Sequence, residues 1–514
     1  MREARRFPHC TVASPHYLAS AAGLSVFARG GNALDAVIGA NLALGVVAPY
    51  YCGYGGDLFA IVWDGRVHGY LGSGPSAGGA SIEQVRRGAG SDTMPWIGAH
   101  TVTVPGAVAG WFDLLDRFGT MSFAELARDA VRLARDGFAL TAKAAELFEG
   151  SAALYTEYPE WQAAYQARTV GAVVRQPALA RTIELLGRDG PDSYYRGPIA
   201  DAMADAVQRG GGALEGSDLA AHAGEWTEPL RAPYRDLDVY ELPPPTQGVT
   251  ALEILRIVDG FALPPDGAER HHLLIEACKL GLADRDAYVT DPAWMPVAAD
   301  ELLADDWIAD RRARIDPDHA SSPPAAVPQR GGTAYLCAAD ADGLMVSLIQ
   351  SNFLAFGSGV HVPEWGINLN NRGSSFTLDA GAANALAPGK RPMHTLVPAL
   401  ALRSGAPALV FGSMGGDAQA QIHPQLLARI VDDGEDVQRA LDAPRWAVEP
   451  GRWSVQAEPT LGDEILRGLE ARGQRVRRTN PLDSRMGHAH AIAPTGDGYA
   501  VGTDPRAEGA ALGL

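Results

Sequence analysis

The chain has 514 residues, 46% of them hydrophobic, and a formal net charge of −18. This composition is typical of a globular protein, and the strong negative charge argues against nucleic acid or an anionic membrane as a partner. No apolar run is long enough to span a membrane, and the start of the chain lacks the apolar core of a secretory signal, so we expect a cytoplasmic protein.

The four cysteines are far apart in the sequence and form no C-x-x-C pair. This spacing disfavours both a zinc cage and a disulfide framework, and it fits a reducing compartment. The sequence therefore implies no metal site, and it implies no organic cofactor. The partner that we expect is a small-molecule substrate.

Predicted helices dominate the first half of the chain. Residues 14–48 predict two helices of small residues separated by a Gly-Gly break, the second capped near Asn32. A glycine-rich turn then leads into two strands that are joined by a turn at Asp64-Gly65. Residues 108–190 are rich in helix formers, and residues 271–289 predict one more helix.

The second half follows the clearest break in the chain. Residues 314–332 are rich in proline, serine and alanine and show no period, which predicts an exposed loop. Two strands joined by a tight turn at Asp342-Gly343 come next. Residues 406–416 then predict a strand that ends in glycines, and residues 418–434 predict a helix. This alternation of strands and helices predicts a layered mixed α/β fold.

A threonine stands where the predicted loop meets the first of these strands. A free alcohol is a weak nucleophile near neutral pH, but a threonine at the start of a chain has its own base, the freed α-amine. An exposed loop before a buried strand is a place where the chain can be cut without unfolding the core. Gly331-Gly332-Thr333 has this arrangement, and glycine permits the strained backbone that an N-to-O acyl shift needs. The same tripeptide is also common as a plain junction, so alone it leaves both interpretations open.

Nine stretches, spread over nearly the whole chain, carry a family resemblance. They are ARGGNALDAVIGANLALGVVAP (28–49), GYGGDLFAIVWDG (53–65), TVPGAVAGW (103–111), PPPTQG (243–248), EACKLGLADRDAY (276–288), NLNNRGSSF (368–376), KRPMHTLVPAL (390–400), GSMGGDAQAQ (412–421) and GTDPRAEGAALG (502–513). In this number and order they resemble the gamma-glutamyltranspeptidase family of N-terminal nucleophile hydrolases. The resemblance implies an α/β fold, a four-layer αββα sandwich with two stacked sheets.

The resemblance also implies that the chain cuts itself between Gly332 and Thr333. Residues 1–332 would form the large subunit of the proenzyme, and residues 333–514 would form the small subunit, which starts at the nucleophile. The two pieces are expected to remain associated after the cut. Whether two such heterodimers pair with each other is left open.

The family's catalytic groups fall on recognisable positions of this chain. Thr333 matches the nucleophile, and Ser351 matches the hydroxyl that hydrogen-bonds to it. Gly415-Gly416 matches the glycines of the oxyanion hole, whose N–H groups stabilise a developing negative charge. The structural alternatives are a solvated strand serine for Ser351 and a simple strand-to-helix turn for the glycine pair.

The residues that hold a glutamyl group in the family are not intact here. The arginine that binds the substrate α-carboxylate would lie near residues 71–73, where this chain has none. The aspartate that binds the α-amino group is replaced by Ser375, and Arg372 stands where a neutral or acidic side chain is usual. Losing an acid and gaining a guanidinium disfavours an α-ammonium group and favours an anion. A structural ion pair is the alternative interpretation of Arg372.

Two further substitutions fall in the same pocket of the family. His394 and Thr395 replace a pair of serines, and Phe353 replaces an asparagine twenty residues after the nucleophile. We expect Arg372 to bind the carboxylate of an acyl substrate, with His394 and Thr395 as additional polar contacts and Ser375 and Phe353 as neighbours in the pocket.

These features predict a self-processing N-terminal threonine hydrolase or acyltransferase. Its substrate would be a small anionic acyl compound, oxalyl-like, glutaryl-like or another short diacid, cleaved at an amide bond or at a C–C bond beside a carbonyl. The branches that the chain resembles include oxamate amidohydrolases, cephalosporin-acylase-like proteins and homologues from 4-alkylproline antibiotic pathways. Two alternatives stay open: a gamma-glutamyltransferase or glutathione hydrolase, and an unprocessed, inactive homologue that acts by binding.

Overall fold

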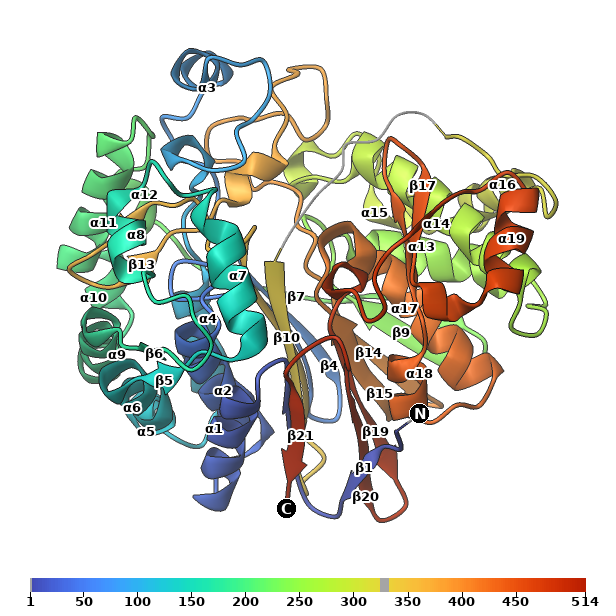
Figure 1. Ribbon diagram of the computed structural model, residues 1–514, viewed down its shortest axis with the longest axis horizontal. Helices are drawn as coiled ribbons and strands as arrows, with labels where there is room; N and C mark the ends of the chain where they lie inside the picture. The colour runs from blue at the N-terminus through green and yellow to red at the C-terminus, as the bar shows by residue number, and fades with distance from the viewer. Residues whose placement is uncertain (1, 324–331) are drawn as a thin grey trace.

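The computed structural model describes residues 2–323 and 332–514. In this part of the chain two seven-stranded sheets are stacked, and helices cover the outer face of each (Figure 1). The architecture is the α/β, four-layer αββα sandwich that the family resemblance implies. Within the described residues, no helix is both long and apolar enough to cross a membrane.

The two central sheets combine strands from both ends of the chain. The first has the order β21 (Ala510–Gly513), β2 (Thr11–Ser14), β10 (Gly332–Ala339), β11 (Met345–Phe353), β3 (Asp57–Trp63), β4 (Val67–Gly72) and β7 (Glu225–Thr227). The second has the order β1 (Arg5–Phe7), β20 (Gly498–Thr503), β19 (Ala489–Thr495), β15 (Ala406–Ser413), β14 (Pro398–Arg403), β9 (Leu237–Glu241) and β8 (Leu230–Tyr234). Each sheet therefore contains strands from both sides of the predicted cut before Thr333.

The strand β10 shows how the residues produce these layers. Tyr335 and Cys337 belong to the apolar cluster between the two sheets, whereas Leu336 and Ala338 belong to the cluster under the helices. Successive side chains of a strand point to opposite faces, so a strand that is apolar at every position fits only where both faces are covered. The continuous apolar run after residue 333 is therefore a consequence of its place in the middle of the sandwich.

Helices from the first half of the chain cover the sheet that contains β10. They are α1 (Tyr17–Ala28), α2 (Ala33–Val47), α4 (Ala107–Phe118), α5 (Phe123–Leu126), α6 (Arg128–Asp136), α7 (Ala142–Ala152), α8 (Pro159–Ala164), α9 (Pro177–Asp189), α10 (Asp192–Tyr195), α11 (Pro198–Arg209) and α12 (Gly216–Ala220), with α3 (Ile82–Ala89) more peripheral (Figure 1). Asn32 caps α2 as predicted, because its side chain accepts a hydrogen bond from the backbone N–H of Asp35.

A second helical layer covers the sheet that contains β15. It consists of α13 (Gly248–Asp259), α14 (Ala268–Tyr288), α15 (Ala299–Leu302), α16 (Asp305–Ala313), α17 (Gln419–Leu427), α18 (Val437–Asp442) and α19 (Asp463–Ala471). Smaller sheets join β16 (Trp446–Glu449), β17 (Ser454–Ala457) and β18 (Arg475–Arg478), β12 (His361–Val362) with β13 (Ile367–Asn368), and β5 (Phe138–Ala139) with β6 (Val173–Val174). The largely buried α13 packs between its sheet and α14.

The structure describes only part of the loop that the sequence predicts at residues 314–332. Residues 324–331, which include Gly331, lie outside the described residues. The strand β10 begins at Gly332, so the prediction that the loop extends through this residue is wrong by one position. The early start follows from the pairing of Gly332 with Phe353 at the end of β11.

Candidate active site

Thr333 lies at the start of β10, in a β-bulge against β11. The pairing register of the two strands shifts between Gly332 and Ala334, so Thr333 alone faces two residues of β11, Ser351 and Asn352. A bulge locally changes the direction in which side chains point. Here it brings the two predicted hydroxyl groups into contact, and Thr333 is only 1% exposed.

The Ser351 hydroxyl connects the predicted nucleophile to the peptide bond that precedes it. Oγ1 of Thr333 donates a hydrogen bond to Oγ of Ser351 at 3.2 Å. Oγ of Ser351 in turn donates to the carbonyl oxygen of Gly332 at 2.7 Å, and it also accepts from the backbone N–H of Phe353 at 2.7 Å. One hydroxyl group thus touches the attacking oxygen and polarises the carbonyl group that lies next to it.

The position before the nucleophile has no room for a side chain. A Cβ atom at Gly332 would lie 2.9 Å from the carbonyl oxygen of Tyr50. Because the obstacle is backbone, it cannot move aside as the end of a flexible side chain could. The close approach of the two chain segments therefore requires glycine at position 332.

Gly415 and Gly416 follow β15 in the second sheet. Their φ angles of 141° and 57° lie in the region that favours glycine. The strand β15 crosses β10 so closely that a Cβ atom at Gly412 would lie 2.4 Å from the ring of Tyr335. This packing places the glycine pair at the same end of the sandwich as Gly332, and Gly332 and Gly415 line one cavity of about 530 Å³.

Gln247 is a residue of this region that the sequence did not single out. Its Nε2 donates to the carbonyl oxygens of Thr395 at 2.8 Å and Gly416 at 3.0 Å. Its Oε1 accepts from Arg285, which also forms an ion pair with Asp417. The buried amide therefore fixes the glycine turn relative to the neighbouring segment. The available signal was its place in the stretch PPPTQG.

Arg372 lies near the end of β11, in the 3-10 helix η3 (Arg372–Ser375). Its Nε is 3.4 Å from Oδ2 of Asp57, which pairs with Ser351 across the strands, and its guanidinium stacks 4.4 Å from the ring centroid of Phe353. Arg372 and Asp57 are fully buried. Nη1 and Nη2 of Arg372 have no hydrogen-bond partner among the described residues.

Burial shifts the pKa values of both residues of this ion pair. Burial raises the pKa of Asp57 to about 7, and the neighbouring Arg372 offsets only part of that shift. Burial also lowers the pKa of the Arg372 guanidinium to about 10, again against the attraction of Asp57. Arg372 therefore stays charged at neutral pH, whereas Asp57 titrates there.

The end of β4 lies beside this ion pair. The strands β3 and β4 pair up to Gly72, so the next residue, Ser73, lies beside Asp57. The sequence has no arginine at residues 71–73, but Arg372 reaches the same neighbourhood from another part of the chain. Arg372 thus brings a guanidinium from η3 to Asp57, near the end of β4.

His394 and Thr395 are also buried in this region. Both ring nitrogens of His394 and Oγ1 of Thr395 lack hydrogen-bond partners within residues 2–323 and 332–514. Burial, and then the charge of Arg372, lowers the pKa of His394 well below its usual range, so the ring is neutral. Ser375 differs, because its hydroxyl already donates to the carbonyl oxygen of Met393 at 2.7 Å. The Ser375 hydroxyl therefore has a local partner as a donor, and it can still accept a hydrogen bond.

A loop that contains the 3-10 helix η7 (Ser484–Met486) forms a wall of the cavity beside Gly415. The backbone N–H of Met414 donates to the carbonyl oxygen of His488 at 3.1 Å. Ser484 lines the cavity, and its Oγ lies 2.7 Å from Nε2 of His488. Burial lowers the pKa of His488 to about 4, so this imidazole is neutral at pH 7.

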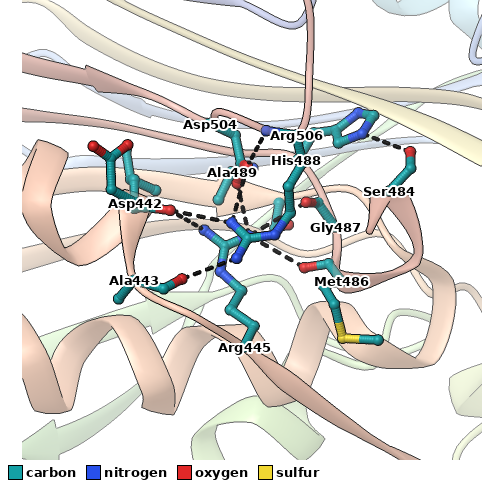
Figure 2. Close-up of polar contacts among 12 residues, drawn as sticks. Asp442, Ala443, Arg445, Ser484, Met486, Gly487, His488, Ala489, Asp504 and Arg506 are labelled. Carbon is teal, nitrogen blue, oxygen red and sulfur yellow. Dashed lines mark hydrogen bonds and ion pairs between the residues drawn. The ribbon is translucent and has the colours of Figure 1, made fainter. Parts of the chain in front are cut away.

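Buried ion pairs hold this loop in place (Figure 2). Arg445 pairs with Asp504 at 2.6 Å and donates to the carbonyl oxygens of Met486 and Gly487. Arg506 contacts the other oxygen of Asp504. Burial alone would raise the pKa of Asp504, but the two arginines hold it well below its usual range. In the part of the chain that the structure describes, no cluster of three or more metal-binding side chains occurs.

Known proteins resemble this chain in sequence and in fold. The sequence model of the gamma-glutamyltranspeptidase family matches residues 19–514. An oxamate amidohydrolase proenzyme of Klebsiella pneumoniae is 36% identical, and a glutathione hydrolase-like YwrD proenzyme of Bacillus subtilis is 34% identical, each over 98% of both chains. The crystal structure of a cephalosporin acylase from Bacillus halodurans superposes with a TM-score of 0.95 at 37% identity, covering 100% of this chain and 97% of that one.

Proposed function

We propose that this chain, which belongs to the gamma-glutamyltranspeptidase family of enzymes, cuts itself before Thr333 and then hydrolyses or transfers a small anionic acyl group. The observation that carries the proposal is the Ser351 hydroxyl, which contacts both the Thr333 oxygen and the Gly332 carbonyl. Relatives that are named proenzymes support the cut.

The self-processing step needs only groups that are already in contact. The Thr333 oxygen attacks the Gly332 carbonyl carbon, the peptide C–N bond breaks, and the nitrogen gains the proton that the hydroxyl loses. Water then hydrolyses the resulting ester, which frees the Gly332 carboxylate and leaves Thr333 with a free hydroxyl and α-amine. The two pieces should stay associated, because β10 pairs with β2 from the large piece and β11 pairs with β3.

The same oxygen would then attack the substrate. The α-amine of Thr333, with an ordinary pKa of about 7.7–8.0, serves as the base. The N–H groups of the Gly415-Gly416 turn would stabilise the oxyanion, an effect worth about 2.7–4 kcal/mol for one donor in other enzymes. Gln247 and Arg285 would act indirectly, by fixing the position of that turn.

An anionic acyl group could bind to the two terminal nitrogens of Arg372. These nitrogens are buried without partners in the described chain, which is costly unless a ligand or water satisfies them. A carboxylate accepts two parallel hydrogen bonds from this edge of a guanidinium. Oxalyl, glutaryl and related diacids fit this requirement, for cleavage at an amide bond or at a C–C bond beside a carbonyl.

Mass spectrometry and a substrate panel test the proposal. The purified protein should consist of a 332-residue and a 182-residue piece, and an oxalyl or glutaryl amide should be turned over at least tenfold faster than glutathione. An intact chain without activity would support an inactive binding homologue. Faster turnover of glutathione would support a glutathione hydrolase, the second candidate, which the glutathione hydrolase-like relative favours.

The pKa of Asp57 predicts how binding of the anionic substrate depends on pH. Below pH 7 Asp57 is protonated and Arg372 contributes a net positive charge, whereas above pH 7 the Asp57 carboxylate compensates that charge. We expect the KM of an anionic acyl substrate to rise by about fivefold between pH 6 and pH 8, which corresponds to a rise of one unit in the pKa of Asp57 on binding.

The variant Asp57→Asn is the control for this pH dependence. Asparagine still accepts a hydrogen bond from Arg372 but does not titrate. The KM of this variant should therefore stay constant between pH 6 and pH 8. KM must be separated from kcat, because the α-amine of Thr333 gains activity with rising pH as it loses its proton. A parent enzyme whose KM is the same at pH 6 and pH 8 would refute the role assigned to Asp57.

A further inference from the structure

The cavity beside the scissile bond is distinct from the region around Arg372. It has a volume of about 530 Å³, and both Gly332 and Gly415 line it, whereas Arg372, His394 and Thr395 do not. Its apolar lining includes Tyr50, Tyr51, Leu147, Leu354, Met414 and Val448. A volume of this size accommodates a ring system of drug-like dimensions, far more than an ammonia or water molecule.

The charged side chains in the described lining of this cavity are already paired. The pairs are Asp417 with Arg285, Glu449 with Arg452, and Arg485 with Asp483. The contrast with Arg372 is clear, because two of its nitrogens have no partner in the described residues. The two regions therefore favour opposite chemistry: an anion near Arg372 and a neutral, apolar group in the cavity.

The walls of the cavity are held in position before any ligand binds. Tyr51 packs edge-on against His488 at 5.5 Å between ring centroids, and the Ser484 hydroxyl is anchored on the same imidazole. The loop that carries Ser484 is tied to Arg445 through backbone carbonyl groups (Figure 2). Binding a rigid ligand in a preformed cavity costs little conformational entropy.

We propose that this cavity binds the leaving group of the substrate, and that this group is neutral, apolar and of the size of a bicyclic ring. The inference rests on the proposed function. For an amide substrate, the Thr333 oxygen bonds to the acyl carbon and the C–N bond breaks. The proton taken up by the α-amine passes to the leaving nitrogen, so the amine departs neutral. The acyl group remains near Arg372, which does not line this cavity.

A series of amides with one acyl group and varied amines tests this inference. The acyl group is oxalyl or glutaryl, and the amines are methylamine, benzylamine, 1-naphthylmethylamine and 4-carboxybenzylamine, all primary alkylamines. We expect kcat/KM to rise about ten- to a hundredfold from the methyl to the naphthylmethyl compound, as burial of apolar surface predicts, mainly through KM. The carboxybenzyl compound should be about tenfold poorer than the benzyl compound.

A pair of matched variants locates the effect in this cavity. Ala447 lines it, so Ala447→Trp should reduce the ratio of naphthylmethyl to methyl turnover by about tenfold. Ala163→Trp makes the same change in a separate cavity of about 510 Å³ beside α8 and should leave the ratio unchanged. Self-processing, followed on a denaturing gel, shows that each variant folds.

Three results would overturn the inference in distinguishable ways. If the parent turns over all four compounds with equal kcat/KM, the acyl chemistry stands and the cavity has no role in selecting the leaving group. If none of the compounds is turned over by the processed enzyme, the proposed function fails and the inference fails with it. An unchanged ratio in Ala447→Trp, with the expected trend in the parent, would place the leaving group elsewhere.

Discussion

Replacing Thr333 with alanine should leave the protein as one chain of 54.2 kDa that has no hydrolytic activity. Alanine has no oxygen to attack the Gly332 carbonyl, so the ester cannot form and no α-amine is released at position 333. Removing a nucleophile that takes part in both steps should lower activity by about a thousandfold or more. A denaturing gel and intact-mass measurement would show one species, where the parent shows two.

The variant Thr333→Ser is the matched control, because it retains a hydroxyl group in the same bulge. It should process, more slowly than the parent, and keep measurable activity. The smaller piece of the parent should begin with the sequence Thr-Ala-Tyr. Cleavage of the alanine variant at the parental rate, or a smaller piece that begins at another residue, would remove Thr333 from the mechanism.

The layers of the fold could be predicted from the sequence because they depend on local patterns. The cap of α2 at Asn32 and the turn at Asp64-Gly65 are encoded within a few residues, and the structure confirms both. The order of strands in the sheets depends instead on contacts between distant segments. The turn at Asp342-Gly343 indicated that β10 pairs with β11, but no local pattern indicated that β2 lies on the other side of β10.

The site was less predictable than the fold, because its key contacts join residues far apart in the chain. The sequence marked Arg372 as unusual, but it offered no means of choosing its partner among many acidic residues. Asp57 becomes that partner only because β3 pairs with β11 and η3 packs over Phe353. Gln247 was missed for a similar reason, since a buried glutamine has no local signature. Its importance follows from two carbonyl groups that the fold places within reach.

Replacing Arg372 with leucine should weaken turnover of the anionic acyl substrate by about ten- to a hundredfold without preventing self-processing. A charged hydrogen bond contributes about 1.5–3 kcal/mol, and the substrate carboxylate would lose its contacts to the guanidinium. The cut requires Thr333, Ser351 and Gly332, and the described structure has no hydrogen bond from Arg372 to any of them. The measurement is kcat/KM for an oxalyl or glutaryl amide, beside a gel that follows processing.

This change also leaves the buried Asp57 without its cation, and breaking a buried pair can destabilise a protein by about 3–5 kcal/mol. The double variant Arg372→Leu with Asp57→Asn removes both charges and separates lost substrate binding from lost stability. Arg372→Lys is a second control, because lysine keeps the charge but cannot form two parallel hydrogen bonds. It should therefore retain part of the activity. If the double variant processes normally and handles every anionic substrate as well as the parent, Arg372 is a structural ion pair. In that case the missing glutamyl-binding residues alone would argue against a gamma-glutamyl substrate.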